Sequence, residues 1–511
     1  MAAAATDVIA TVGIVISVRG SVFRRGAIRW WLAATLVAGA LLATAAPPAT
    51  AAPRPLLTGV AGLDNYDPLA FQQARATGAR LVHMPIAWVH VAPRMQPGSW
   101  QPEDPADPNY DWAKFDRAVT GAVGAGLTPV LLIDGAPLWA QRCRAPSVVK
   151  GEALEGRLCN PDPGMLAAFA TAAARRYSGR FQGLPRVRFW QGMNEPNLSL
   201  FFNPQFRRGK SVSPRLYRKL INAFYAAVKA VDRSNLVLAA GLGPIAVPHL
   251  TIGPMRFARE LLCMRGRRDP QPTRGNCDGG VHFDIFDVHP YTTGGPTHEG
   301  RIDDVQLGDL AKLKELLKAA DMAGRIKGRF RHTPLWITEF SWDSNPPDPG
   351  GVAMRILSRW TAEALYQAWS AGVSRFFWFS LRDYPMRDLP FSETLQSGLY
   401  FRGATLAENQ PKEVLYAFRF PFVAFSEEKG FSFWGRTSTS TGGKVVIQIW
   451  QRRKWRNASV ARADRRGIFE GLVQATYGRN KHGSVRARYR GETAIPFSLR
   501  PVKDFYQPPF G

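Results

Sequence analysis

The chain has 511 residues, too many for one ordinary domain and enough for a barrel of roughly 250 to 400 residues with a smaller domain beside it. Apolar residues make up 45% and charged residues 21%, as in folded globular proteins, so the composition excludes a disordered chain. The formal charge of +26 favours either a polyanionic partner or a solvated basic surface and says nothing about the fold.

Residues 1–52 are typical of an export signal. Three arginines between residues 24 and 29 form a basic region, an apolar stretch follows over residues 30–46, and Ala49-Thr50-Ala51 has the small-residue pattern of a cleavage site. We therefore predict cleavage near Ala51 and a secreted or cell-surface protein. A second apolar stretch precedes the arginines, so a retained membrane anchor and a start codon placed too early are alternatives.

From about residue 56, short apolar runs alternate with amphipathic stretches, which is typical of βαβ units. Eight runs are predicted as strands, the number that closes a (β/α)8 TIM barrel: 56–62, 81–89, 128–134, 187–193, 236–241, 283–289, 334–340 and 375–381. Helices are expected at 67–77, 111–125, 165–177, 214–231, 307–322, 352–371 and 411–425, with no clear long helix between the fifth and sixth strands. These elements predict a catalytic barrel over residues 53–428.

The pattern changes after that boundary. Short β-type runs between Gly and Asn turns predict a small all-β, sandwich-like domain over residues 429–511. Lys and Arg outnumber Asp and Glu by about four to one there, and the alternation of Arg486, Arg488 and Arg490 predicts that all three lie on one strand face. We expect an accessory domain that binds an anionic cell-surface polymer or a membrane surface. The alternative is an edge strand protected by its charge.

Four cysteines fit an oxidising compartment. Cys143 and Cys159 flank one loop-like stretch, and Cys263 and Cys277 flank another, so two local disulfides are the simplest of the three possible pairings. No metal site is expected, because the chain has no C-x-x-C and no nearby pair of histidines. No cofactor is expected, since nucleotide-binding glycine motifs are absent, and a nucleic-acid partner would rest on charge alone.

Two glutamates stand where apolar strands end. Glu195 follows the fourth predicted strand in Asn194-Glu195-Pro196, and Glu339 ends the seventh in Thr338-Glu339-Phe340. Paired carboxyl groups cleave glycosidic bonds, and barrels carry their active sites at the C-terminal ends of strands. Strands four and seven are expected to face each other across the mouth. We also expect Pro196 to hold Glu195 in an extended conformation.

These motifs resemble those of the clan A retaining glycoside hydrolases, the superfamily of cellulase-like and β-xylosidase-like enzymes, over about residues 56–425. The resemblance implies that Glu195 is the acid/base and Glu339 the nucleophile. His289-Pro290-Tyr291 matches the clan's strand-six motif, and Trp378 matches its strand-eight tryptophan.

The resemblance also implies substrate-binding roles. Asn194 would bond the sugar 2-hydroxyl, Tyr291 would orient the nucleophile, His289 would tie the acid/base region together, and Trp378 would form an apolar floor under the sugar. His83 stands where many members carry an Arg, and Asp134 stands where cellulase-like members often carry a His. Asp134 either contacts a distal hydroxyl or caps a loop.

The expected function is retaining hydrolysis of O-glycosidic bonds in a β-linked oligo- or polysaccharide. The alternative is a non-catalytic cell-surface protein that binds polysaccharide on a barrel scaffold. The identity of the sugar, the linkage, and endo or exo action stay open at this point.

Overall fold

The computed structural model describes residues 55–510, apart from 64–65, 144–157, 248–249, 275–276, 278, 387–389, 392–393 and 475–482. The predicted export segment lies outside the described residues. Residues Arg54–Gly511 form one compact unit. The division predicted at residue 428 stays a prediction, and the barrel and the C-terminal sheets are described in turn.

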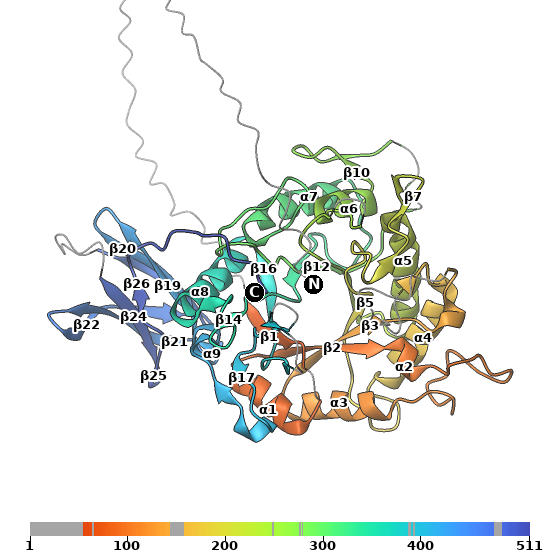
Figure 1. The fold of residues 1–511 in the computed structure, drawn as a ribbon, viewed down its shortest axis with the longest axis horizontal. Helices are drawn as coiled ribbons and strands as arrows, with labels where there is room; N and C mark the ends of the chain where they lie inside the picture. Colours follow the sequence, from red (N-terminus) through yellow and green to blue (C-terminus); the bar gives the residue numbers. More distant parts are fainter. Residues whose placement is uncertain are drawn as a thin grey trace, which may run out of the picture. The chain divides into compact units, whose positions relative to one another are not determined.

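The central element is a closed barrel of eight parallel strands, as predicted (Figure 1). Neighbours in the ring are neighbours along the chain, in the order β1-β16-β13-β12-β9-β5-β3-β2. The strands are β1 (Leu57–Ala61), β2 (Leu81–Ala87), β3 (Thr128–Asp134), β5 (Phe189–Gly192), β9 (Leu236–Leu242), β12 (Ile285–Val288), β13 (Leu335–Ile337) and β16 (Val373–Phe379). Each of the eight begins and ends within three residues of its predicted bounds.

Alternation along the strands separates two cores. Residues that point into the barrel form a compact cluster of Ala61, Leu81, Val130, Leu236, Leu238, Ile285, Trp336 and Phe377. The residues between them, such as Val82, Met84 and Ile86 of β2, belong to the larger core. This period of two is what a parallel barrel strand requires, because one face fills the barrel and the other packs on the helices.

Helices surround the barrel (Figure 1). They are α1 (Pro68–Ala76), α2 (Trp88–Val91), α3 (Ala113–Gly124), α4 (Pro163–Arg176), α5 (Ser213–Val231), α6 (Pro254–Leu261), α7 (Leu310–Met322), α8 (Met354–Ser370) and α9 (Glu413–Arg419). Asp67 and Asp162 cap α1 and α4 by accepting backbone N–H groups, and each is followed by a proline in the first turn. Among the described residues between the fifth and sixth strands, the short α6 is the one helix.

The predicted closing helix over residues 411–425 is wrong in its second half. Helix α9 ends at Arg419, and β19 (Phe422–Glu427) begins directly after Pro421. Proline has no backbone N–H and cannot continue a helix, so the chain leaves α9 and enters the first strand of the C-terminal sheets.

Two antiparallel sheets follow. One is three-stranded, with β19, β20 (Gly430–Arg436) and β23 (Ile468–Val473). The other is five-stranded, with β21 (Gly443–Gln451), β22 (Lys454–Ala463), β24 (Ser484–Tyr489), β25 (Glu492–Thr493) and β26 (Phe497–Ser498). The first sheet packs on α8, where the ring of Trp434 lies 5.6 Å from Tyr366 and 5.5 Å from Trp369.

Short strand pairs decorate the loops of the barrel. They are β4 (Leu158–Cys159) with β6 (Phe202–Asn203), β7 (Phe206–Arg207) with β8 (Lys210–Ser211), β10 (Met264–Arg265) with β11 (Gln271–Pro272), β14 (Ser344–Asn345) with β15 (Val352–Ala353), and β17 (Tyr400–Phe401) with β18 (Gln410–Pro411). Within the described part of the chain, the search for a helix long and apolar enough to cross a membrane finds none.

Both predicted disulfides are present. Cys143 pairs with Cys159 and Cys263 with Cys277, at Cα–Cα distances of 5.2 and 6.0 Å. Both distances lie in the usual range for disulfides. Each bond closes a local loop between barrel elements, which agrees with the pairing expected from the sequence.

Candidate active site

Two carboxylates meet at one histidine. Nδ1 of His289 lies 2.9 Å from Oε1 of Glu195 and 3.8 Å from Oε2 of Glu339. Their side chains are 10% and 16% exposed, and that of His289 is fully buried. Because both distances are measured from Nδ1, Oε1 of Glu195 and Oε2 of Glu339 are at most 2.9 plus 3.8 Å apart, about 6.7 Å. The structure thus brings together three residues that the sequence singled out.

The barrel explains this meeting. Glu195 follows β5, His289 follows β12, and Glu339 follows β13, so all three stand just beyond the C-terminal ends of parallel strands. Along the ring β5 and β13 are separated by β9 and β12. The histidine from β12 therefore reaches both glutamates from between their strands.

The backbone at Glu195 is not extended, so that expectation was wrong. Its φ is 37°, in the region that favours glycine, and Met193 has a φ of 67°. The strain has a visible cause, because the N–H of Glu195 donates to the carbonyl of Gly241 while the N–H of Leu198 closes a turn onto the carbonyl of Glu195. Such strain, about 1–3 kcal/mol, is typical of functional positions.

A glycine gives this carboxylate its space. A Cβ placed on Gly243 would lie 3.1 Å from Oε1 of Glu195 and 2.7 Å from Cδ1 of Leu198. A side chain at Gly243 would therefore push on the turn that carries Glu195. The close approach of β9's C-terminal end to the turn is part of how Glu195 is placed.

A hydrogen-bonded chain continues behind His289. Its Nε2 lies 3.0 Å from Oγ1 of Thr338, whose hydroxyl donates to Oδ2 of Asp287 at 2.8 Å. If both ring nitrogens of His289 carry protons, Nδ1 donates to Glu195 and Nε2 donates to Thr338, and every partner is matched. The chain therefore favours a cationic imidazole beside the two carboxylates.

The pKa shifts agree with that arrangement. Burial opposes the charged form of His289, but Glu339, Glu195 and Asp287 outweigh it and raise the pKa of the ring to about 9. Burial raises the pKa of Glu339 to about 7, with the His289 charge opposing and the Glu195 charge adding to the rise. Glu339 therefore keeps its proton to a higher pH than an ordinary carboxyl group.

Three further predicted residues lie around the pair. The hydroxyl of Tyr291 donates to Oε2 of Glu339 at 3.2 Å. Asn194 is buried, and its Oδ1 has no hydrogen-bond partner among the described residues. Asp134, at the end of β3, accepts the backbone N–H groups of Gly135 and Asn194, and its pKa is raised to about 6, mainly by burial. All three therefore border the carboxylates.

His83 takes a different place. Its Nε2 lies 2.6 Å from Oε1 of Gln191, on β5. Burial lowers the pKa of His83 to about 4, although the Gln191 hydrogen bond opposes this shift. His83 is therefore neutral at physiological pH and supports the interior of the site.

Trp378 is not brought to the mouth of the barrel. It is fully buried in the outer core, its Nε1 donates to the carbonyl of Ser397 at 2.7 Å, and its ring lies 6.1 Å from Phe418 of α9. The next residue, Phe379, packs on the inner cluster and stacks on Tyr384 at 6.0 Å. Phe379, one residue along, is thus the aromatic residue that faces the inner side of the barrel at the end of β16.

Sequence reasoning missed Gln191, Asp287 and Thr338. A signal was present for Asp287, because Asp287, His289 and Tyr291 alternate and so share the inward face. Gln191 and Thr338 carried no such signal, since their partners come from other strands.

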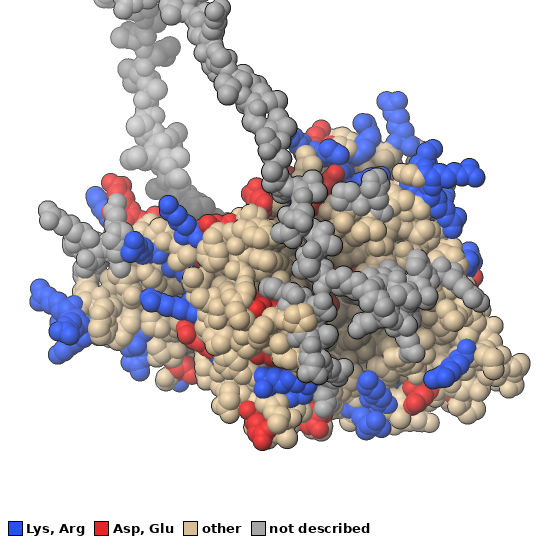
Figure 2. Space-filling view, in the orientation of Figure 1, with Lys and Arg blue, Asp and Glu red and all other residues tan. Residues whose placement is uncertain are grey.

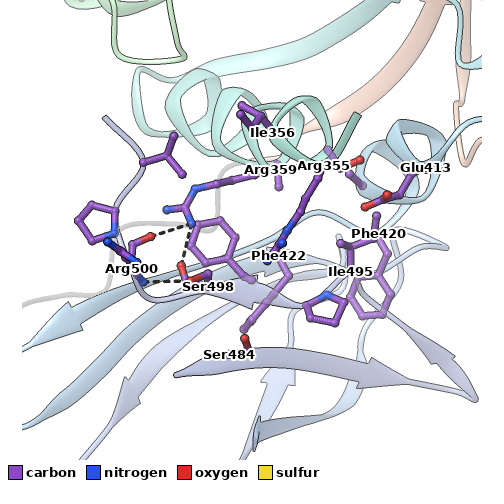
Figure 3. Close-up of a pocket in the computed structure, with 17 residues that line it drawn as sticks. Arg355, Ile356, Arg359, Glu413, Phe420, Phe422, Ser484, Ile495, Ser498 and Arg500 are labelled. Atoms are coloured by element: carbon purple, nitrogen blue, oxygen red, sulfur yellow. Dashed lines mark hydrogen bonds between the residues drawn. The ribbon is translucent and has the colours of Figure 1, made fainter. Parts of the chain in front are cut away.

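Among the described residues no cluster of His, Cys, Asp or Glu has an arrangement that would hold a metal ion. A cavity of about 710 Å³ lies away from the glutamates, between α8, α9 and the C-terminal strands (Figure 3). Its lining includes Arg355, Arg359 and Glu413 but no pair of carboxylates. The chemistry therefore belongs to the barrel mouth.

No family model matches the chain, and no curated protein matches it. Among solved structures, a family 39 glycoside hydrolase from the gut symbiont Bacteroides cellulosilyticus WH2 is 16% identical, with coverage of 82% of this chain and 79% of that chain and a TM-score of 0.49. A monomeric beta-xylosidase from Caulobacter crescentus CB15 is 14% identical over 83% and 96%, with a TM-score of 0.49. The beta-glucuronidase 2 of Bacteroides uniformis is 11% identical over 88% and 46%, with a TM-score of 0.41. These similarities are too low to assign an activity, so function rests on the side chains described above.

Proposed function

We propose that the protein is a retaining β-glycosidase that hydrolyses O-glycosidic bonds in a β-linked oligo- or polysaccharide. The observation that carries the proposal is the convergence of Glu195 and Glu339 on Nδ1 of His289. Retaining enzymes hold their carboxyl groups about 5–5.5 Å apart, and inverting enzymes about 6.5–9.5 Å. The upper bound set by His289 leaves room for the retaining separation and excludes all but the shortest inverting separations.

The roles follow from what each carboxylate contacts. Glu339 accepts the Tyr291 hydroxyl, which stabilises its ionised form and aims it, so it is the nucleophile. Its carboxylate attacks the anomeric carbon while Glu195 gives its proton to the departing oxygen. Water then attacks the same carbon, its proton passes to Glu195, and Glu339 is released. His289 holds both carboxyl groups during these two steps.

Asn194 and Phe379 complete the proposed sugar site. The buried Oδ1 of Asn194 is an acceptor for a sugar hydroxyl, a contact that strengthens as charge develops in the transition state. Phe379 takes the role of apolar wall that the sequence had assigned to Trp378.

The test is a hydrolysis screen of purified protein against aryl β-glycosides and polysaccharides, with NMR of the first product. We expect activity in the parent, a first product with unchanged anomeric configuration, and near-complete loss in Glu339→Gln and Glu195→Gln. Glu470→Gln, at an exposed glutamate on β23, is the matched control. Full activity in either active-site variant, or an inverted first product, contradicts the proposal. Glycan binding without hydrolysis would favour the non-catalytic alternative.

We also propose that the C-terminal sheets hold an acidic polysaccharide. On the outer face of the five-stranded sheet, Lys444 pairs with Arg462 across β21 and β22, and Arg488 of β24 borders the same row. A hollow of about 360 Å³ on this face includes Lys444, Asn457, Arg488 and Arg490 in its lining. Lys and Arg side chains gather at the edge occupied by β22 (Figure 2).

Aromatic rings on that face favour a sugar polymer over a membrane. The guanidinium of Arg486 lies 4.0 Å from the ring centre of Trp455, and Trp450 is 43% exposed beside it at 5.3 Å. Cations with flat aromatic rings along a sheet suit a chain of charged sugars. Export from the cell, suggested by residues 1–52 and by the two disulfides, would place this face among such polymers.

A further inference from the structure

The segment 504–510 returns from the C-terminal sheets to the middle of the barrel (Figure 1). The ring of Phe510 lies 5.0 Å from that of Tyr291, tilted by 59°. Tyr291 is the residue whose hydroxyl donates to Glu339. Phe510 is thus one aromatic ring away from a carboxylate of the candidate site, although it lies 171 positions further along the chain than Glu339.

We propose that Phe510 forms a wall of the substrate site and contacts the sugar bound at Glu339, so that it helps to determine specificity. This inference rests on the glycosidase function proposed above. It adds a substrate-contact residue from outside the barrel, in a segment that no strand-end pattern would single out.

The segment is held by specific bonds on two barrel loops. Asp504 accepts the backbone N–H of Gly295 and lies 3.0 Å from Nδ1 of His298, both in the loop after β12. The N–H of Gln507 donates to the carbonyl of Thr293 in the same loop at 3.1 Å. The carbonyl of Pro509 accepts the N–H of Asp343, in the loop after β13, at 2.6 Å. Both loops begin at strands that carry the site.

A second set of contacts fixes the segment where it leaves the sheets. Arg359 of α8 donates to the carbonyls of Ser498 and Arg500 at 2.8 and 3.2 Å, beside the cavity shown in Figure 3. The ring of Phe505 packs on Trp360 of α8 at 4.8 Å. The chain therefore enters the mouth from α8 along a defined path.

Phe510 differs from its neighbours in exposure. Tyr506 is 72% exposed, whereas Phe510 is half-buried against Tyr291, so part of Phe510 stays accessible next to a residue that contacts Glu339. Ligand sites are lined by aromatic side chains with a few polar groups, and a flat ring suits the apolar face of a sugar. A contact of this kind is made before and during the reaction, so its loss raises KM and leaves kcat nearly unchanged.

The test compares Phe510→Ala, Phe510→Leu and Phe510→Trp with the parent, on the aryl β-glycoside that the parent hydrolyses best. We expect KM to rise about ten-fold in Phe510→Ala, to stay high in Phe510→Leu, and to return near the parent value in Phe510→Trp. Tyr506→Ala is the control and should match the parent. Asp504→Asn, which weakens the anchor, should raise KM in the same direction.

An unchanged KM in Phe510→Ala overturns the inference, as does equal rescue by Leu and Trp, because a flat ring would then not be needed. A fall in kcat with a shifted pH profile and constant KM also overturns it, since the ring would then act on Tyr291 and Glu339 and not on the sugar. If the parent hydrolyses no glycoside, the proposed function fails and this inference falls with it. If the parent is active, the variants test the role of Phe510 independently of the proposed function.

Discussion

At the scale of single residues, the site depends on two carboxyl groups that meet at one histidine. Glu195 and Glu339 lie at the same nitrogen of His289, and burial together with the Glu195 charge raises the pKa of Glu339. The charge of His289 opposes that rise. The acid and the nucleophile are thus prepared as a unit, before any sugar is present.

The activity should therefore fall on the acidic side near the raised pKa of Glu339, about 7, because the nucleophile acts only in its ionised form. As pH falls through that value Glu339 takes up a proton, and it can no longer attack the anomeric carbon. We expect kcat/KM to fall below about pH 7, whatever the leaving group. A pH profile with a leaving group that needs no proton is the comparison and should show the same acidic limb. The absence of an acidic limb for both substrates contradicts this assignment.

The loss of activity on removal of the acid should depend on the leaving group. In Glu195→Ala we expect kcat to fall by about 10²–10⁴ for a sugar leaving group, the usual contribution of general acid catalysis. For an activated aryl leaving group the first step needs no proton, and the fall should be far smaller. Steady-state kinetics on the two substrate types decides. Equal losses of kcat on both substrate types would contradict the assignment of Glu195 as the acid.

The sequence predicted the strand-end positions of both glutamates, His289 and Tyr291. Each of them follows an apolar run whose end is visible in the sequence. Trp378 was misplaced by one residue for a physical reason. In Phe376-Phe377-Trp378-Phe379 every residue is aromatic, so no polar side chain marks which face points into the barrel. Contacts such as that between His83 and Gln191 cross the barrel, and no local pattern encodes them.

At the scale of elements, a buried ion pair joins the last barrel strand to the closing helix. Lys412, directly before α9, has its Nζ against Asp383, which follows β16, and both side chains are nearly inaccessible. The same Nζ donates to Oγ of Ser344 and to the carbonyl of Gln396 at 2.8 and 2.9 Å. One cation therefore satisfies three acceptors, from the connections that follow β13 and β16.

Lys412→Met should destabilise the protein by about 3–5 kcal/mol, because it leaves the carboxylate of Asp383 buried without its counter-charge. Chemical or thermal unfolding measures the effect. The double variant Lys412→Met, Asp383→Asn should lose less stability than the single variant, because the uncompensated charge of Asp383 is then absent. Lys454→Met, at an exposed position next to a turn, should change the stability by less than about 0.5 kcal/mol. A single variant as stable as the parent would show that the pair contributes little.

All eight barrel strands were predictable because each is a short apolar run between a turn and a helix. The closing helix was not, since the apolar residues of 411–425 serve a helix before Pro421 and a strand after it. The short α6 was also hard to foresee, because eight residues contain too few turns for a clear period. The loops, whose structure depends on long-range contacts, were left undefined by the sequence.

At the scale of the molecule, charge is concentrated on the C-terminal sheets. Arg486 and Arg488 alternate with the buried Val485, Ala487 and Tyr489 on β24. Arg490 follows the strand in a turn, with a φ of 48°, so the prediction of three arginines on one strand face holds for two of them. Attraction by exposed charges is screened beyond a Debye length of about 8 Å at physiological ionic strength. Binding through this face must therefore weaken as salt rises.

Retention on immobilised polygalacturonate should fall with salt, and should fall several-fold at fixed salt when Arg486, Arg488 and Arg490 are changed to Ser. The matched control changes Arg265, Arg267 and Arg268 to Ser, three exposed arginines near β10 on the barrel. Hydrolysis of small glycosides should be unaffected in both. Equal losses of retention in the two triple variants would mean that retention depends only on net charge. Stronger retention on anionic vesicles than on the polysaccharide would favour a membrane as the partner.

The contacts of segment 504–510 also impose an order of events during synthesis. The strands that bear Glu195, His289 and Glu339 leave the ribosome long before Phe510, which follows them by at least 171 positions. A nascent chain can therefore assemble its carboxylate pair while the mouth still lacks one wall. The site is then complete only when Asp504 and Pro509 dock onto loops that have already folded.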